Sequence, residues 1–492
     1  MDELTPLSQA TLHRFPETVR RPNYDRASLL PGIVHIGLGN FHRAHQAWYL
    51  HRLMNAGQGR DWAIIGAGVR PDDSLMRNKL LAQDCLTTLI ELGPTRVSAE
   101  IVGSMIDFVE VERGNAGLIK RMADPTIRIV TLTVTESGYF VDPVTKAFDT
   151  DHPDIVHDAI NPDTPRTAFG AIVAALRLRR TRGSGPFTCL SCDNLQSNGG
   201  ILRQAVVTLA RLQEAELADW IDTECSFPNA MVDCIVPATG PDEIALAAGF
   251  GIRDAAPVTH EPFRQWVIED RFCAGRPDWA QVGVQFTDHV HGYEAQKLRI
   301  LNAGHQVIAN LAEVLGICTV AQAMAHPQIN ALFRKVQVTE IVPHVLPVQG
   351  MTPEQYVDLT AQRFSNPSIH DTIRRVAFDG SSRHPGFVLP SLRDALASGT
   401  SIEGLALVEA FWARMCAGMR EDGTTIAPND PHWSSLVDAA HQAREHPVAW
   451  LEQQRIYGDL GAQAKFQKSF ANWLGLIWSQ GSTAALRAYT GV

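Results

Sequence analysis

The chain has 492 residues, of which 45% are hydrophobic and 20% charged, and its formal net charge is −10. This length suits two or three domains with a large core, and the composition is that of a globular protein. The acidic balance gives no electrostatic basis for binding nucleic acid or an anionic membrane surface. No apolar run reaches the roughly 18 residues of a membrane span. The start, Met1-Asp2-Glu3-Leu4, has no basic and apolar signal segment, so we expect a cytoplasmic protein.

The eight cysteines are scattered along the chain, which predicts reduced core residues rather than a disulfide framework. Cys189 and Cys192 form a CxxC pair, but structural zinc needs a second ligand pair at similar spacing, and the sequence has none. The pair also falls at the end of a predicted strand, which is the wrong context for a redox motif. We therefore expect no bound metal.

The first half of the chain alternates strands and helices. A short apolar strand over residues 33–36 is followed by a glycine turn and a helix to about Asn55, a layout that directs helix amides toward a pyrophosphate. The usual third glycine is replaced by His42. A GxG after a strand also fits an ordinary tight turn, so the pattern is weak by itself. The turn residues expected to contact a dinucleotide are Gly37, Gly39, Asn40 and Phe41.

An acidic pair follows the second predicted strand, which covers residues 62–69. Asp72 and Asp73 occupy the position where an acidic side chain binds the adenosine ribose and disfavours a 2′-phosphate. They could also cap the helix expected over residues 74–81, and the two roles are compatible. Arg70 keeps NADP open as a less favoured cofactor than NAD.

Two further strands complete the predicted α/β domain. The β-branched run 127–135 reads as a buried parallel strand ending in a loop at Glu136, at the edge of the sheet where ligands bind. A strand over 187–191 ends at Asn194, and Asn198 is expected to cap the next helix. Residues 141–165 are expected to form a long excursion, and 234–236 another strand. The alternation predicts a doubly wound α/β fold.

Helical periodicity dominates from about residue 288 onward, with helices expected over 297–315, 329–337, 353–364, 368–376, 402–417, 434–446 and 462–474. We therefore expect a Rossmann-type NAD-binding domain over residues 1–287 and a mostly α-helical substrate and catalytic domain over residues 288–492.

The helix expected over 297–315 carries a lysine in an unusual position. At about 100° per residue, Lys297 falls in the middle of an apolar stripe, with Glu294, Asn302 and His305 along its edge. A lysine there must be paired or neutral, and burial lowers the pKa of a lysine toward the range of a general base. The alternative is a lysine that extends to solvent beside residues that only brace the helix.

Two arginines, Arg375 and Arg383, flank the expected loop Asp379-Gly-Ser-Ser382. Such a pair is usually a solvated surface. Next to an anionic or polyhydroxylated ligand, the same guanidinium groups would anchor the substrate.

Together these pieces resemble the mannitol dehydrogenase family, the polyol-specific long-chain dehydrogenases/reductases. The resemblance spans about residues 30 to 390, and the Lys-x4-Asn-x2-His pattern in register with the glycine turn is highly specific. The matching stretches are Ile36-Gly37-Leu-Gly39-Asn40-Phe41-His42-Arg43-Ala-His45, Thr135-Glu136-Ser-Gly138-Tyr139, Ser191-Cys-Asp193-Asn194, Ser226-Phe-Pro-Asn-Ala-Met-Val-Asp233, Glu261-Pro-Phe-Arg-Gln-Trp266, and Lys297 with Asn302 and His305.

The resemblance implies a metal-independent secondary alcohol dehydrogenase that interconverts D-mannitol and D-fructose with NAD, or acts on D-arabinitol or D-sorbitol. It assigns the catalytic base to Lys297 and the oxyanion-stabilising amides to Asn194 and Asn302. The other roles it implies are substrate binding by His305, Arg375 and Arg383, contact with substrate and lysine by Asp233, proton passage by Glu294, and ribose recognition by Asp72 and Asp73. The last basic position often holds lysine in the family, so the contact of Arg383 differs in detail.

Other functions fit parts of the pattern. A fructuronate- or tagaturonate-type reductase would use the two arginines for a substrate carboxylate. A nucleotide-binding protein without activity would keep the fold but needs none of the catalytic side chains. A zinc alcohol dehydrogenase is the fourth possibility. We expect a polyol or ketose as the partner, no nucleic acid or membrane, and a monomer or small homo-oligomer.

Overall fold

The computed structural model describes residues 4–141 and 147–492. Residues 1–3, which belong to the segment used to predict a cytoplasmic location, lie outside these ranges. So do residues 142–146 of the excursion predicted over 141–165. The chain divides into two compact units, residues 1–291 and residues 292–492. Helix α10, Val290–Gln296, crosses this division in the sequence. Within the described ranges, no helix is both long enough and apolar enough to cross a membrane.

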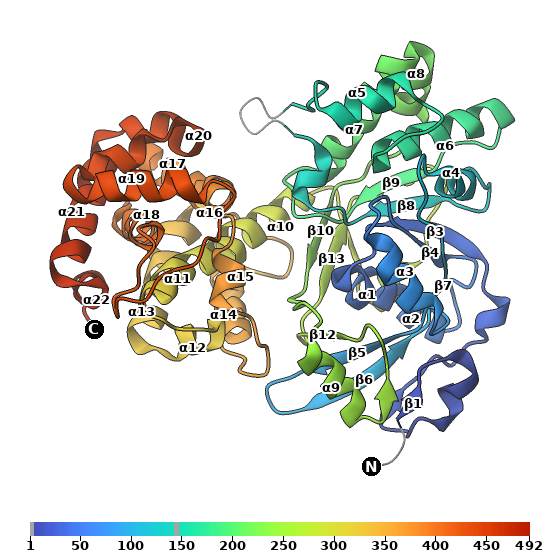
Figure 1. Ribbon diagram of the computed structural model, residues 1–492, viewed down its shortest axis with the longest axis horizontal. Helices are drawn as coiled ribbons and strands as arrows, with labels where there is room; N and C mark the ends of the chain where they lie inside the picture. The colour runs from blue at the N-terminus through green and yellow to red at the C-terminus, as the bar shows by residue number, and fades with distance from the viewer. Residues whose placement is uncertain (1–3, 142–146) are drawn as a thin grey trace. The chain divides into compact units, whose positions relative to one another are not determined.

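Unit 1 is built around a five-stranded parallel sheet in the order β7-β4-β3-β8-β9 (Figure 1). The first strand in sequence lies in the middle and the order reverses beside it, which is the arrangement of Rossmann folds. This confirms the predicted fold class. The strands are β3 Pro31–Ile36, β4 Ala63–Ala67, β7 Met105–Phe108, β8 Ile129–Leu132 and β9 Thr188–Ser191.

Both faces of this sheet are buried, because neighbouring residues of each strand enter different cores. Ile33, Ile64 and Ile129 pack in one core with residues of α2, whereas Val34 and Val130 pack in the other with residues of α6 and α7. The helices of unit 1 are α1 Asn40–Ala44, α2 Gln46–Asn55, α3 Asp73–Leu81, α4 Ala116–Met122, α5 Pro153–Ile160, α6 Ala168–Arg182, α7 Asn198–Gln213, α8 Ala215–Glu224 and α9 Pro241–Gly249.

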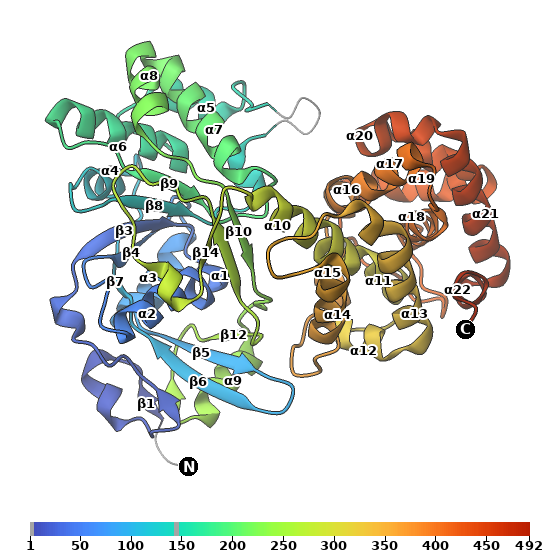
Figure 2. The same cartoon turned by 180° about the vertical axis from the view of Figure 1, so that it is seen from behind.

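Three smaller sheets extend unit 1, and in one of them β13 lies between β10 and β14, two strands that Figure 2 labels. The two-stranded sheet contains β1 Thr5–Pro6 and β11 Ile252–Arg253, and the four-stranded sheet contains β12 Val258–His260, β5 Thr87–Leu92, β6 Val97–Val102 and β2 Val19–Arg20. The three-stranded sheet contains β10 Ala230–Asp233, β13 Gln265–Ile268 and β14 Gln285–Phe286. The 3-10 turns of unit 1 are η1 Gln9–Arg14, η2 Arg26–Ser28, η3 Glu136–Tyr139 and η4 Trp279–Val282.

Several local expectations for unit 1 are wrong. The strand lies at Ala230–Asp233 instead of residues 234–236, because its antiparallel pairing with Gln265–Ile268 ends at Asp233. Helix α7 already includes Asn198, so that residue does not cap it. The excursion over 141–165 contains a helix, α5.

Unit 2 is helical, as predicted, and its central helix α11 is buried on every side. Its apolar residues Ile308 and Leu311 are buried, and so are its polar residues Gln306, Asn310 and Glu313, so burial extends beyond the apolar stripe expected from the sequence. The helices are α11 Ala303–Val314, α12 Val320–Ala325, α13 Pro327–Val336, α14 Pro353–Phe364, α15 Ile373–Ala377, α16 Gly380–Arg383, α17 Leu389–Ser398, α18 Glu403–Cys416, α19 Trp433–Glu445, α20 Gln454–Tyr457, α21 Ala464–Gln480 and α22 Ser482–Thr490, with 3-10 turns η7 Val342–His344, η9 Pro447–Glu452 and η10 Gly458–Ala462.

Three segments of unit 2 are π-helical: η5 Lys297–Asn302, η6 Gln337–Ile341 and η8 His384–Val388. The helix expected from residue 297 therefore begins in π geometry. The loop expected at residues 379–382 is the start of short helix α16, and the helix expected over 368–376 forms only from Ile373.

Candidate active site

The glycine turn after β3 has one position that only glycine can occupy. Gly37 has a φ of +92°, and a Cβ there would lie 2.3 Å from the Thr133 carbonyl oxygen. At Gly39, by contrast, a Cβ would meet no atom within 4 Å, so the space beside this backbone is open. Asn40 donates to the Pro237 carbonyl at 3.0 Å, which fixes the start of α1. The turn thus leaves room for a ligand beside Gly39.

Substituting Gly37 by alanine is expected to abolish NADH binding and to lower the thermal stability. The new Cβ would overlap the backbone of the strand beside it, in a region of φ that non-glycine residues rarely adopt. Fluorescence titration with NADH and a melting curve would measure both effects. Gly39→Ala is the matched control and should fold normally, because its Cβ enters open space. Normal NADH affinity in Gly37→Ala would contradict this account.

Two histidines stack on each other next to this turn, His35 from β3 and His42 from α1. The rings of His35 and His42 are 3.4 Å apart at their centroids, and both residues are buried. His35 Nδ1 and Nε2 contact the Thr131 and Thr133 hydroxyls at 2.7 and 2.9 Å. Burial lowers the pKa of His35 to about 3 and that of His42 well below its ordinary value. The third-glycine position is therefore filled by a neutral core side chain.

Acid stability should depend on His35. Its pKa falls from 6.5 in the unfolded chain to about 3 in the folded one, so the unfolded chain binds more protons between these values. Its contribution to stability is full above pH 6.5 and is lost as the pH falls toward 3. In His35→Asn, urea midpoints measured from pH 7 to pH 4 should fall less steeply than in wild type. An equal slope would show that His35 does not contribute.

The acidic pair after β4 lies at the start of α3. Asp73 Oδ2 accepts from the Arg70 backbone N–H at 2.9 Å, and a Cβ on Gly68 would lie 2.3 Å from the Asp73 Cβ. Asp72 is exposed and its side chain makes no capping hydrogen bond to α3. The capping alternative therefore fails for Asp72, whose carboxylate faces solvent. Asp73 instead closes the turn that follows the strand.

Asp193, directly before Asn194, joins the ends of two strands. Its carboxylate accepts from the backbone N–H groups of Val134 and Thr135 at 3.1 and 2.9 Å, and from the Tyr139 hydroxyl at 2.8 Å. Burial raises its pKa to about 6 against the effect of these hydrogen bonds. The carboxylate fixes the segment that contains Glu136 relative to the end of β9. Glu136 itself is exposed and lies in η3 rather than in the expected loop.

Asn198, which the sequence predicts to cap a helix, instead connects two elements of the candidate site. Its buried carboxamide bonds both backbone groups of Ala230, donating at 2.8 Å and accepting at 3.0 Å. It also donates to the carbonyls of Ser191 and Asp193 at 3.3 and 3.2 Å. This one side chain connects the end of β9 with β10. The two predicted site residues of this region, Asn194 and Asp233, therefore lie on connected elements. Asn194 is exposed and Asp233 is buried.

Lys297 opens the π segment η5 and is only 8% exposed, so the expectation of a buried lysine is confirmed. Hydrogen bonds in a π-helix join residues five apart, so Lys297 and Asn302 lie one turn apart on the same side of the helix. In α geometry, five residues would separate them by about 140° around the helix axis. Gln337 donates to the Ile300 carbonyl at 2.8 Å and so supports this turn from η6. Glu294, at the end of α10, is also buried.

His305, on α11, stacks on Phe364 with 4.2 Å between ring centroids. Its Nε2 lies 3.9 Å from Asp371 Oδ2, beyond hydrogen-bond range, and burial lowers its pKa to about 3. His305 is therefore neutral at physiological pH, with a buried ring nitrogen that forms no hydrogen bond to the described residues. Such a nitrogen suits a ligand hydroxyl.

Asp371 also binds one of the two predicted substrate arginines. Its carboxylate accepts from Arg375 Nε and from one terminal amine, both at 2.6 Å, while its own side chain is 2% exposed. Arg383 donates to the Val376 and Arg375 carbonyls at 2.7 and 3.2 Å. His305 and Arg375 thus both lie next to Asp371, and Arg383 is held against the backbone of α15, the helix that carries Arg375. Sequence reasoning missed Asp371, for which the only signal was its position four residues before Arg375.

The cysteines are free thiols, and both members of the CxxC pair are buried. Burial raises the pKa of Cys189 and of Cys192 well above the ordinary thiol value. In the described part of the chain, no group of three or more His, Cys, Asp or Glu side chains is arranged to hold a metal ion.

The parallel sheet with its glycine turn, joined to a helical unit that carries a buried lysine, defines a Rossmann-type protein with a C-terminal helical domain. The mannitol dehydrogenase Rossmann domain model matches residues 31–281, and the mannitol dehydrogenase C-terminal domain model matches residues 289–478. The chain belongs to the mannitol dehydrogenase family.

Relatives cover nearly the whole chain. Mannitol 2-dehydrogenase of Cereibacter sphaeroides is 56% identical over 472 residues, which is 96% of this chain and 99% of that protein. The Pseudomonas fluorescens mannitol 2-dehydrogenase ternary complex with NAD and D-mannitol matches with a TM-score of 0.92 and 39% identity, over 99% of this chain and 100% of that one. A substrate-free D-sorbitol dehydrogenase matches with a TM-score of 0.86 and 32% identity, over 98% and 100% of the two chains.

Proposed function

We propose that this protein is an NAD-dependent, metal-independent polyol dehydrogenase that oxidises D-mannitol to D-fructose. The observation that carries the proposal is Lys297, buried at the start of a π turn with Asn302 on the same side of the helix. The similarity to mannitol 2-dehydrogenases over nearly the full chain supports the substrate class. The open space beside Gly39 and the exposed carboxylate of Asp72 fit the pyrophosphate and ribose of NAD.

Oxidation of a secondary alcohol removes a hydride from carbon and a proton from oxygen, and the proposed mechanism gives each a different acceptor. NAD, when bound, accepts the hydride from carbon. Lys297, unprotonated, takes the hydroxyl proton, and Glu294 passes it on to solvent. The carboxamides of Asn194 and Asn302 donate hydrogen bonds to the oxygen as negative charge develops on it, and each such donor is worth about 3 kcal/mol in the transition state. Asp233 would contact the substrate.

The neutral ring of His305 would bind a substrate hydroxyl, and Arg375 and Arg383 would lie along the polyol. Asp371 neutralises Arg375 through two hydrogen bonds, which favours a polyhydroxylated substrate over an anionic one. This contact therefore argues against the alternative, a fructuronate- or tagaturonate-type reductase.

The test is a substrate panel with purified, EDTA-treated protein and both cofactors. We expect oxidation of D-mannitol with NAD, weaker oxidation of D-arabinitol or D-sorbitol, and lower activity with NADP. Faster reduction of fructuronate than of fructose would support the sugar-acid alternative instead. NADH binding without turnover of any of these substrates would indicate a nucleotide-binding protein, and loss of activity in EDTA would contradict metal independence.

Asp371→Asn should raise KM for the polyol about tenfold or more and change kcat less. The amide cannot accept both Arg375 hydrogen bonds and leaves that guanidinium charge uncompensated beside His305. Steady-state kinetics would measure the split. Asp358→Asn is the matched control, because Asp358 forms an exposed ion pair with Arg334 in the same unit. A loss of kcat without a change in KM would contradict a positioning role in substrate binding.

A further inference from the structure

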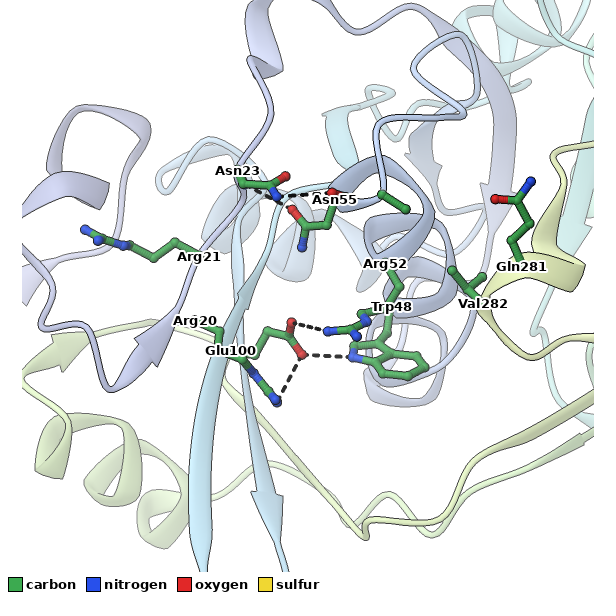
Figure 3. A pocket seen from close by; sticks show the side chains of 10 residues that line it. Arg20, Arg21, Asn23, Trp48, Arg52, Asn55, Glu100, Gln281 and Val282 are labelled. Carbon is green, nitrogen blue, oxygen red and sulfur yellow. Dashed lines mark hydrogen bonds and ion pairs between the residues drawn. The ribbon is translucent and has the colours of Figure 1, made fainter.

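Unit 1 contains a cavity of about 700 Å³ that none of the proposed catalytic or cofactor residues lines. Its walls come from β2, α2, β6 and η4 (Figure 3). This volume lies within the range of about 300 to 1,000 Å³ that is usual for small-molecule sites. The cavity is therefore large enough for a metabolite and separate from the site already described.

The lining is positively charged in a protein whose overall charge is negative. Arg20, Arg21 and Arg52 line the cavity with a single acidic residue, Glu100. The Arg21 guanidinium donates to the Leu12 carbonyl outside the cavity, so Arg20, Arg52 and Glu100 give a formal charge of +1. The whole chain has a formal charge of −10. A concave basic surface on an acidic protein selects for anions.

Glu100 organises two of these arginines. Its carboxylate is 4% exposed and accepts from Trp48 Nε1 at 2.9 Å. Arg20 and Arg52 approach its two oxygens at 3.4 and 3.7 Å, and Figure 3 shows both converging on it while Arg21 points away. Burial raises the pKa of Glu100, but His51 at 3.6 Å, the Trp48 hydrogen bond and Arg20 outweigh this effect and lower the pKa to about 2.

The two arginines nevertheless keep unused hydrogen-bonding capacity. The side chains of Arg20 and Arg52 are 54% and 44% exposed, and each contact with Glu100 is long. A guanidinium has five N–H donors, so most of the donors of Arg20 and Arg52 remain accessible to a ligand.

The other walls indicate a polar ligand rather than a stacked base. Arg264 lies 4.0 Å from the centroid of the Trp48 ring, so one face of the indole is already covered. Asn23 and Asn55 hydrogen-bond each other beside the cavity, and Asn55 Nδ2 also contacts His51 Nε2 at 2.9 Å. The side-chain oxygen of Asn23 can still accept from a hydroxyl group.

We propose that this cavity is a second ligand site, which binds a phosphate monoester of a small polyhydroxylated molecule through Arg20 and Arg52. A phosphate monoester carries a charge of about −1.5 to −2 at neutral pH, opposite in sign to the lining, and has three acceptor oxygens for the guanidinium groups. The side-chain oxygen of Asn23 accepts from a hydroxyl group of the ester.

Calorimetry with glucose 6-phosphate and with inorganic phosphate tests this proposal, on protein saturated with NADH so that the glycine turn is occupied. We expect one bound ester per chain, bound more tightly than inorganic phosphate. Arg20→Gln and Arg52→Gln should each weaken binding about tenfold. Arg60→Gln, an exposed arginine outside the cavity, should bind as wild type does.

Three outcomes would overturn the proposal. One is no ester binding to the wild type, measured by heat or by a shift in Tm. Another is equal affinity in both cavity variants with their Tm unchanged, which would place the anion elsewhere. A hexaglutamate peptide that binds more tightly than the ester would instead indicate an acidic protein partner for this cavity.

Discussion

Replacing Lys297 by alanine is expected to lower kcat for D-mannitol oxidation at least about 100-fold, because no other group would take the hydroxyl proton. NADH affinity should stay near the wild-type value, since the glycine turn and the acidic pair belong to unit 1. Stopped-flow turnover and NADH fluorescence titration would measure the two effects. If the variant retained more than about a tenth of the wild-type kcat, Lys297 could not be the general base.

Two comparisons separate proton transfer from packing. Lys297→Met keeps most of the side-chain volume and should be as inactive as the alanine variant. A small primary amine added to Lys297→Ala should restore part of the rate. Lys335→Ala is the matched control in the same unit: Lys335 donates to the Tyr489 carbonyl, and its loss should leave kcat unchanged.

Asn302→Ala is expected to lower kcat by about 100- to 1,000-fold while KM for the polyol changes little. The carboxamide would act on charge that exists only as the proton leaves, so its removal raises the barrier without weakening substrate binding. Steady-state kinetics with D-mannitol would measure the changes in kcat and KM separately.

Asn330→Ala controls for loss of an asparagine in the helical unit, since Asn330 donates only to the Met324 carbonyl. It should leave both constants unchanged. A rise in KM with normal kcat in Asn302→Ala would show that Asn302 binds the substrate in its ground state and does not stabilise the oxyanion.

The sequence predicted the parts of the fold that depend on local patterns. Buried parallel strands are β-branched runs, so β3, β4, β8 and β9 were found close to their observed positions. The sheet formed by β12, β5, β6 and β2 was missed. Its edge strands β2 and β12 have only two and three residues and lie far apart in the sequence, so no local pattern specifies their partners. The six-residue strands β5 and β6 form a local hairpin that was not predicted from the sequence.

Site residues were predictable where the family pattern named them, and their neighbours were not. Asp371 and Gln337 act on groups far from them in sequence: Asp371 lies beside His305, and Gln337 bonds the Ile300 carbonyl. An aspartate or glutamine gives no sign of such a partner until the chain is folded. The π geometry at Lys297 was equally hidden, because the residues of that turn have ordinary helical propensities.

The wide turn at Lys297–Asn302 ties the candidate site to one helical geometry. If the same six residues tightened to α geometry, with about 100° between successive residues, Lys297 and Asn302 would be separated by about 140° around the helix axis. Lys297 would then face away from Asn302, although every side chain of the signature would still be present. Substitutions that favour the α form of this turn over the π form should therefore lower activity without removing any catalytic side chain.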